Sequence, residues 1–450
     1  MEERKELIDE LKDLLEEKKY KLLAMQMQEL NEVDIAAFLD DLPAEDVLIL
    51  FRLIPKDLSA DVFSQMGIDN QTRIVESISA QELKSIVEHL AMDDAVDMIE
   101  ELPANLVKKV LGSATPDTRK VINQYLKYPS NSAGSIMTAE YVALKKWMNV
   151  SQALEYIRSN GVDSETIYTC YVTNVQRELL GVVTLKDLVM GNPKTQIEDL
   201  MDEDVISAYT MEDQEEVTNL FNRYDLLALP VVDLENRVVG IITVDDMVDV
   251  MEQEATEDIQ KMAAIVPSEK PYFSTSVFEM AKNRIFWLLF LMISSMLTGL
   301  LLTKYEDAFQ VVPLLVSFIP MMTGTGGNAG SQSSTLIIRA MTLGEIEPKD
   351  ILRVWWKEIR VALICGLVLA GVNFLRLELQ YPGEDLVCLT VVISMFGTII
   401  IAKSIGCMLP IAAKLLRLDP AIMAAPLIST IVDVCSLFLY FQIACALIGL

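Results

Sequence analysis

A glycine-rich polar run, Pro320-Met-Met-Thr-Gly-Thr-Gly-Gly-Asn-Ala-Gly-Ser-Gln-Ser-Ser334, lies inside a long apolar segment of this chain. Membrane hydrocarbon offers polar groups no partner, so such a run requires closely packed helices or access to water. The run therefore predicts either tight helix packing or the lining of an aqueous pore.

A single acid, Asp433, lies in the last apolar segment, residues 421–450. Counted from the polar end of each segment, Asn328 is eleven residues from Arg339, and Asp433 is twelve from Ala421. At about 1.5 Å per residue, both lie roughly 16–18 Å deep, near the middle of a hydrocarbon core about 30 Å thick. Because an intramembrane carboxylate usually marks an ion or proton path, pore lining is favoured over a structural hydrogen bond.

Five apolar segments predict a membrane domain over residues 276–450. The segments are 285–303, 309–338, 361–374, 386–413 and 421–450, the third extended by its flanks at 354–356 and 375–379. Basic residues gather at the ends that lie on the side of the N-terminus: Lys282, Arg284, Arg339, Lys349, Arg353, Lys357, Lys414 and Arg417. The positive-inside rule then predicts a plasma-membrane protein, surrounded by lipid, with a cytoplasmic N-terminus and an external C-terminus.

The net charge of −28 belongs entirely to the first part of the chain. Residues 1–275 hold 53 acids and 25 bases, whereas residues 276–450 hold twelve of each. Phosphates would be repelled, so we expect no nucleic-acid partner; the acids indicate solvation or binding of hard cations. With His89 as the only histidine, a His-based zinc site or catalytic triad is excluded. The apolar segments lack HExxH, GxGD and Gly-x-Ser-x-Gly elements, so we predict that the protein is not an enzyme.

The first 115 residues carry a twelve-residue repeat. The recurring pairs are Leu42-Pro43, Ile54-Pro55, Met66-Gly67, Ile78-Ser79, Leu90-Ala91 and Leu102-Pro103. The segments between them can each form two helical turns with one apolar face. Short helices at a fixed period are typical of an α-solenoid, whose units bury their apolar faces on neighbours. We predict an α-helical solenoid over residues 1–130.

Two similar halves follow, predicted as 131–195 and 196–250. One contains Leu180-Gly-Val-Val-Thr-Leu-Lys-Asp-Leu188 and the other Val239-Gly-Ile-Ile-Thr-Val-Asp-Asp-Met247. Each fits the order β-α-β-β-α, and Thr184 and Thr243 suit helix capping. The pattern resembles a pair of CBS domains. That resemblance implies an adenine nucleotide such as ATP in the cleft between the halves, with Asp187 contacting the ribose.

An acidic stretch, residues 245–258, has seven acids and no base in fourteen residues. On a helix, Glu254, Glu257 and Asp258 would share one face, and like charges at this spacing destabilise a helix. A divalent cation or a basic partner would relieve the repulsion; the alternative is a merely solvated helix. We predict an acidic connecting helix over residues 251–275.

Together these features resemble the MgtE family of magnesium channels over essentially the whole chain. The most specific stretches are residues 324–333, 254–258 and 426–433. The resemblance implies a multi-domain helical membrane protein that forms a homodimer with the pore between its membrane domains. The implied pore residues are Asp433, Asn328, Gly327, Ser331 and Ser429. The implied regulatory Mg²⁺ ligands are Asp93, Asp97, Asp213, Glu215, Asp225, Asp246, Asp249, Glu254, Glu257, Asp258 and Asp419. In the solenoid, Asp94 is an equally good choice by spacing.

The predicted function is therefore a Mg²⁺ channel that cytoplasmic Mg²⁺ closes. The alternatives are a coupled transporter using Asp433 as a protonatable carrier site, and a membrane sensor without transport. Lys403 lies eleven residues before Lys414, at a similar depth to Asp433. It either forms an intramembrane ion pair or faces water elsewhere, and it would weaken cation binding if it pointed at Asp433.

Overall fold

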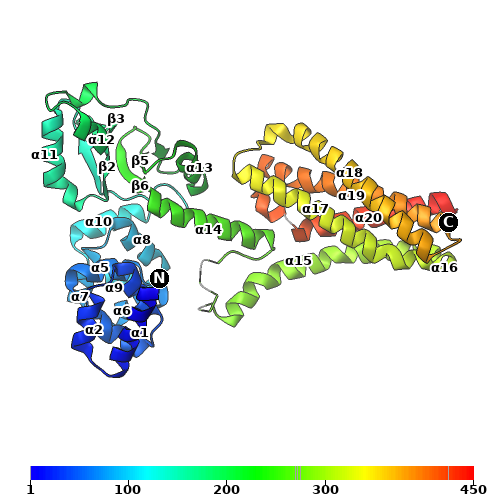
Figure 1. The fold of residues 1–450 in the computed structure, drawn as a ribbon, viewed down its shortest axis with the longest axis horizontal. Helices are drawn as coiled ribbons and strands as arrows, with labels where there is room; N and C mark the ends of the chain where they lie inside the picture. Colours follow the sequence, from blue (N-terminus) through cyan, green and yellow to red (C-terminus); the bar gives the residue numbers. More distant parts are fainter. Residues whose placement is uncertain (1, 269, 271, 274, 424, 450) are drawn as a thin grey trace. The chain divides into compact units, whose positions relative to one another are not determined.

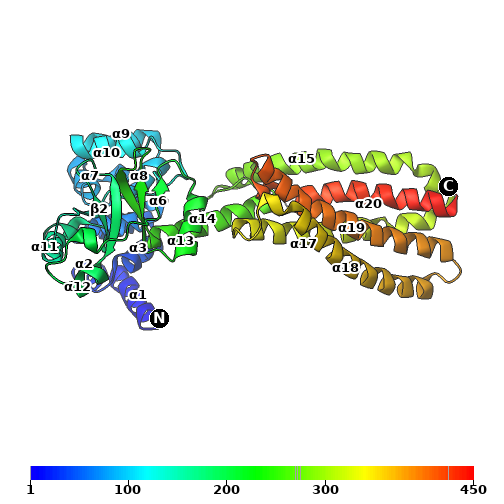
Figure 2. The ribbon, with the colours of Figure 1, turned by 90° about the horizontal axis from the view of Figure 1, so that it is seen from above.

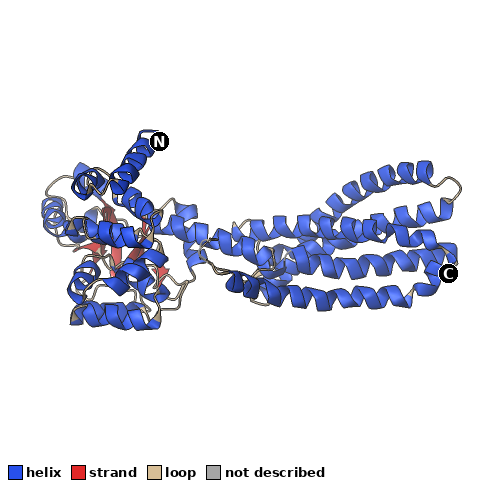
Figure 3. Cartoon of the chain, turned by 90° about the horizontal axis from the view of Figure 1, so that it is seen from below, coloured by secondary structure: helices blue, strands red, loops and turns tan. Residues whose placement is uncertain are grey.

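The computed structural model describes residues 2–268, 270, 272–273, 275–423 and 425–449. The chain divides into two compact units, Met1–Met251 and Glu252–Leu450. The first holds the solenoid and both CBS halves, and the second holds the long apolar helices. We describe each unit by itself, and Figure 3 shows that the strands belong to the first.

The twelve-residue repeat folds as short helices joined by tight turns (Figure 1). Pro43, Pro55 and Pro103 each precede a helix, and the side chains of Ser79 and Thr115 cap two others. Apolar faces of successive helices form one buried core, which confirms the predicted solenoid. The helices are α1 (Glu2–Glu16), α2 (Tyr20–Met27), α3 (Glu32–Asp40), α4 (Ala44–Phe51), α5 (Lys56–Ser64), α6 (Ile68–Ser77), α7 (Ala80–Val87), α8 (Met92–Glu101), α9 (Ala104–Ser113) and α10 (Pro116–Tyr125).

The predicted order β-α-β-β-α appears twice after the solenoid. Each half forms a three-stranded sheet in which the middle strand is parallel to the first and antiparallel to the third. The first half consists of β1 (Tyr141–Leu144), α11 (Val150–Asn160), β2 (Thr166–Thr173), β3 (Leu179–Thr184) and α12 (Leu185–Met190). The second consists of β4 (Ala208–Tyr209), α13 (Gln214–Tyr224), β5 (Ala228–Val232), β6 (Val238–Thr243) and α14 (Val244–Met262). Short 3₁₀ turns lie at Gly161–Asp163 and Ile197–Asp199.

The acidic connecting helix is α14, and both predicted bounds were wrong: it starts at Val244 instead of residue 251 and ends at Met262 instead of residue 275. Because β6 runs directly into it at Val244, the acids from Asp245 onward lie on one continuous helix. The domain boundaries of the sequence analysis otherwise stay predictions.

The second unit is built of long helices lying side by side (Figure 2). Four described helices are long and apolar enough to cross a membrane: α15 (Val277–Lys304), α18 (Ile351–Gln380), α19 (Asp385–Leu415) and α20 (Ala425–Ile448). The polar run lies on a further helix, α17 (Ile319–Thr342), preceded by α16 (Glu306–Val311) and a 3₁₀ turn (Pro313–Phe318). Further 3₁₀ turns lie at Pro348–Asp350 and Pro420–Met423.

Two details of the predicted spans were wrong. Segment 309–338 is not one helix, because α17 begins only at Ile319. Likewise, α20 begins at Ala425 instead of residue 421, after a 3₁₀ turn. Asp433 therefore lies eight residues into its helix, roughly 12 Å from the helix start, and so nearer to that end than predicted.

Glycines allow α17 to approach α19 backbone to backbone. A Cβ atom placed on Gly406 of α19 would lie 2.3 Å from the carbonyl oxygen of Gly330 on α17. Small residues at a helix interface are how membrane helices achieve close van der Waals contact. The packing alternative considered for the polar run is therefore correct for one face of α17.

We expect Gly406→Ala to lower the free energy of unfolding of the purified protein in detergent by about 1–3 kcal/mol, since overpacking forces the two backbones apart. The melting temperature should fall accordingly. Gly371→Ala is the matched control, because a Cβ on Gly371 of α18 meets nothing within 4 Å. Equal melting temperatures for the two variants would contradict this account of the α17–α19 contact.

Candidate functional site

The polar run has two faces because α17 continues through it as a helix. Gly324, Asn328 and Gln332, spaced by four residues, are exposed, whereas Gly326 and Gly330 are buried. An exposed polar stripe on a helix that lies among apolar membrane helices needs water or another protein surface beside it. This stripe, unlike the buried Gly326 and Gly330, is therefore available to line a pore.

Asp433 lies on α20 near the same helix. One turn before it, Ser429 packs against α17 so closely that a Cβ on Gly327 would lie 3.1 Å from the Ser429 Oγ. The Asp433 side chain is partly buried, and no ion pair with it forms within the described part of the chain. The structure thus brings Gly327 and Ser429 together, but no hydrogen bond between described residues joins Asn328 or Ser331 to Asp433.

Lys403 does not pair with Asp433. Its Nζ lies 3.7 Å from Oε2 of Glu358 on α18 and donates to Oγ of Ser333 on α17 at 3.1 Å. Ser333 in turn donates to the same Glu358 oxygen at 2.6 Å. The expected alternative of an intramembrane ion pair is correct, and its acid is one that sequence reasoning missed. Breaking such a buried pair costs about 3–5 kcal/mol in soluble proteins.

Acids of the solenoid and the second CBS half meet within the first unit. Burial, followed by the charge of Asp94, raises the pKa of Asp93 to about 7. Burial likewise raises the pKa of Asp246 to about 6, with Asp93 and Asp245 adding to the shift while Thr243 donates to its carboxylate at 2.6 Å. Asp93 Oδ1 is buried without a hydrogen-bond partner. Such carboxylates favour any cation that can neutralise them.

Two further acids join this cluster, Asp94 and Glu165. Burial and the charge of Asp246 raise the pKa of Asp94 to about 6, and burial with the Asp246 charge also raises the pKa of Glu165. Asp94 follows Asp93 on α8 and is the alternative that the spacing allowed, whereas Glu165 precedes β2, so only the folded chain reveals it. Asp97 lies one turn after Asp93, and burial, followed by the charges of Asp93 and Asp94, raises its pKa to about 7.

The C-terminal part of α14 contains a second group of acids with a lysine among them. Lys261 Nζ lies 2.6 Å from Glu257 Oε1 and 2.6 Å from Oδ2 of Asp419, which precedes α20. Burial raises the pKa of Asp258, as does the charge of Asp419, although Lys261 opposes the shift. The predicted residues Glu257, Asp258 and Asp419 are therefore brought together around an ammonium group.

The remaining predicted residues have structural partners or lie apart. Asp213 caps α13 by accepting from the Glu215 N–H, and Asp225 ends the same helix in a left-handed conformation. Asp187 accepts from the N–H of Thr184 in a capping box, so its carboxylate already serves the start of α12. Asp249 is exposed, and Glu254 is partly buried.

Among the described residues, no group of three or more His, Cys, Asp or Glu side chains is arranged to hold a metal ion directly. The acids instead form the two groups described above, one around Asp93 and Asp246 and one at the end of α14. Mg²⁺ loses its water reluctantly and is often bound through its hydration shell, so such loose groups suit the hydrated ion better than a dehydrated one.

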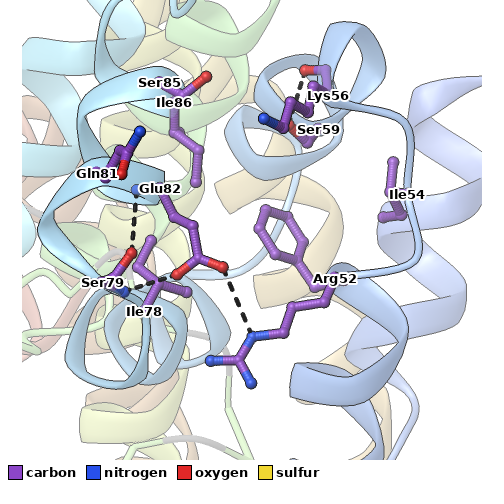
Figure 4. A pocket seen from close by; sticks show the side chains of 11 residues that line it. Arg52, Ile54, Lys56, Ser59, Ile78, Ser79, Gln81, Glu82, Ser85 and Ile86 are labelled. Atoms are coloured by element: carbon purple, nitrogen blue, oxygen red, sulfur yellow. Dashed lines mark hydrogen bonds and ion pairs between the residues drawn. The ribbon is translucent and has the colours of Figure 1, made fainter.

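A pocket in the solenoid has a different character (Figure 4). It measures about 490 Å³ and is lined by Phe51, Arg52, Ile54, Lys56, Ser59, Ile78, Ser79, Gln81, Glu82, Ser85 and Ile86. Its one acid, Glu82, accepts from the backbone N–H of Ser79, which lowers the pKa of Glu82, and it faces Arg52. With two bases and one engaged acid, this pocket does not resemble a cation site.

The pKa shift of Asp93 predicts a pH dependence of stability. Because its pKa is about 7 when folded and about 3.8 otherwise, the folded state binds the extra proton, and its stability falls as pH rises from about 4 to 7. We expect Asp93→Asn to stabilise the full-length protein by on the order of 2 kcal/mol at pH 8 in chelator, and by much less at pH 4.5.

Urea unfolding read by proteolysis of the first unit measures this effect. Asp13→Asn, in an exposed position of α1, is the control and should leave the free energy of unfolding unchanged at both pH values. An Asp93→Asn effect of equal size at both pH values would contradict the burial of an ionised carboxylate.

Comparison with known proteins covers most of the chain. Family profiles match for the MgtE divalent cation transporter over residues 319–443, the MgtE intracellular N domain over 30–131, and the CBS domain over 133–191 and 197–253. The chain is 35% identical to the magnesium transporter MgtE of Thermus thermophilus, covering 96% of this chain and 97% of that protein. It is 34% identical to the Bacillus subtilis MgtE, covering 92% and 94%.

Solved structures agree. The cytosolic domain of the Mg²⁺ channel MgtE in complex with ATP is 34% identical, with a TM-score of 0.52, over 54% of this chain and 99% of that one. The soluble part of a magnesium transporter is 28% identical, with a TM-score of 0.53, over 56% and 99%. This chain therefore belongs to the MgtE family of magnesium transporters, which makes it a multi-pass membrane protein that transports Mg²⁺ and has a cytoplasmic N-terminal domain.

Proposed function

We propose that the protein is a Mg²⁺ channel whose pore lies between two copies of the membrane unit in the plasma membrane, with the C-terminus outside. The exposed stripe of Gly324, Asn328 and Gln332 carries the proposal, since these groups require water or a second copy beside them. The pore residues are the implied set of Asp433, Asn328, Gly327, Ser331 and Ser429.

Asp433 supplies the charge of this pore. A homodimer brings two such carboxylates to one site, and their combined charge attracts a divalent cation more strongly than a monovalent one. Rings of carboxylates and carbonyl groups are a usual selectivity device in channels. Because Mg²⁺ keeps its water, the carboxylates hold the ion through its hydration shell.

The cytoplasmic acids close the pore when Mg²⁺ is plentiful. Bridging by Mg²⁺ relieves repulsion among Asp93, Asp94 and Asp246, and a further ion near Glu257 and Asp258 favours a closed arrangement of α14. A differential affinity worth a few kcal/mol is enough to shift a two-state gate substantially. The remaining acids of the proposed regulatory site are the implied ligands Asp97, Asp213, Glu215, Asp225, Asp249, Glu254 and Asp419.

ATP binding in the CBS cleft is a second, regulatory part of the proposal. It is supported by the relative whose cytosolic domain was solved with ATP. Asp187 contacts the ribose only if its carboxylate oxygens serve both the nucleotide and the capping box with Thr184.

The first test concerns the pore. We expect Asp433→Asn to reduce Mg²⁺ flux at least tenfold, because removing the carboxylate removes the attraction for the cation. Asp385→Asn, at the exposed start of α19, should leave flux unchanged. Patch recording of the purified protein measures the flux and separates a channel from a carrier by the current per protein. Full Mg²⁺ flux in Asp433→Asn would refute the pore assignment.

The second test concerns gating. Replacing Glu254, Glu257 and Asp258 together with Gln, Gln and Asn should blunt inhibition by cytoplasmic Mg²⁺, shifting the half-inhibiting concentration about tenfold upward. It should also remove Mg²⁺-dependent protection of α14 from protease. The control neutralises three exposed acids of α1, Glu10, Asp13 and Glu16, and so makes the same change in net charge. Equal responses of the two triple variants would show that only bulk charge matters.

A further inference from the structure

A buried polar triad joins three helices of the membrane unit. Ser333 of α17, Glu358 of α18 and Lys403 of α19 have exposed fractions of 0%, 9% and 6%. Ser333 Oγ donates to Glu358 Oε2 at 2.6 Å and accepts from Lys403 Nζ at 3.1 Å. One hydroxyl thus bridges both charged groups, each of which is costly inside a membrane and retained only with a partner.

The triad lies one helical turn from a close contact between the backbones of α17 and α19. Gly330 is three residues before Ser333, and Gly406 is three residues after Lys403; these glycines pack backbone to backbone. Both the rotation and the axial position of α17 are therefore fixed at adjacent turns. Beside Lys403, Ser404 accepts from the indole N–H of Trp355 at 3.2 Å, which fixes α18 against α19 at the same level.

That rotation decides which residues of α17 are exposed. Successive residues are about 100° apart around a helix axis, so a small rotation of α17 would turn the exposed Asn328 toward a neighbouring helix. Ser333 is on the buried face, five residues beyond Asn328. A hydrogen bond anchored on a charged pair is directional, whereas contacts between glycines are not.

We propose that Ser333, Glu358 and Lys403 are positioning residues that hold α17 at the rotation presenting Asn328 and Ser331 to the ion, and so set transport rate and ion preference. They do so without touching the ion. The inference rests on the proposed pore function, because it takes the exposed face of α17 as the ion path.

The charged pair makes the proposal testable by a double-mutant cycle in the full-length protein. Lys403→Met and Glu358→Gln each leave one buried charge without its partner, whereas the double variant leaves none. In proteoliposomes we expect Mg²⁺ uptake per folded protein to fall about tenfold in each single variant. In the double variant, uptake should be at least about threefold higher than in either single variant. Lys403→Arg, which keeps the charge, should retain most uptake.

Ser333→Ala tests positioning separately from folding, since it leaves the ion pair in place. We expect it to change the ratio of Mg²⁺ to Ca²⁺ uptake by about threefold. Ser394→Ala is the matched control, because Ser394 of α19 is equally buried and its Oγ has no hydrogen-bond partner. It should leave the ratio unchanged.

Two results would overturn the proposal. One is an unchanged uptake ratio in Ser333→Ala; the other is a double variant no more active than the singles although it folds. If Lys403→Met yields no folded protein, the Ser333→Ala ratio decides alone. Asp433→Asn is measured in parallel: normal uptake there refutes the pore assignment, whereas the coupling of Lys403 with Glu358 is read from the cycle independently.

Discussion

Charged groups among apolar membrane helices must be compensated, and this chain meets that requirement in two ways. Glu358 and Lys403 neutralise each other within this chain, with Ser333 between them. Asp433 has no ion-pair partner in the described part of the chain, although α20 places it among apolar residues. A carboxylate that its own chain does not compensate has to be compensated by water or a cation. The internal pair is therefore a structural element of this unit, whereas Asp433 keeps an uncompensated carboxylate, which is why we propose it as the charge of the pore.

The cytoplasmic acids follow the same electrostatic rule in a wetter setting. Burial, followed by the charges of neighbouring acids, raises the pKa values of Asp93, Asp94 and Asp246 to about 6–7. Near neutral pH a proton or another cation therefore stabilises the packed arrangement. At the end of α14 the compensating charge is built in, because Lys261 contacts both Glu257 and Asp419. The two acidic groups therefore differ: the pKa values of the first are raised by burial and by other acids, whereas the second already holds one cationic group that an incoming ion must share or displace.

Sequence reasoning predicted most of the fold because periodicity records burial directly. The twelve-residue repeat, the doubled β-α-β-β-α order and the apolar lengths each correspond to one element pattern. It failed where local backbone geometry intervenes: α17 starts at Ile319 and α20 at Ala425, since 3₁₀ turns precede both. It also missed Glu358, Glu165 and Lys261, because none stands in a motif and each becomes informative only beside residues distant in the chain.

The polar run shows why a motif can carry two roles at once. Read as a string, its glycines and hydroxyls suit either packing or a pore, and the sequence left that choice open. The helix divides the run between two faces, because residues four apart share a face. Gly326 and Gly330 pack against neighbours, while Gly324 and Asn328 stay exposed. The exposed face depends on the packed one, because along the glycine-rich part of α17 close backbone contact and the triad at Ser333 replace the packing of large apolar side chains.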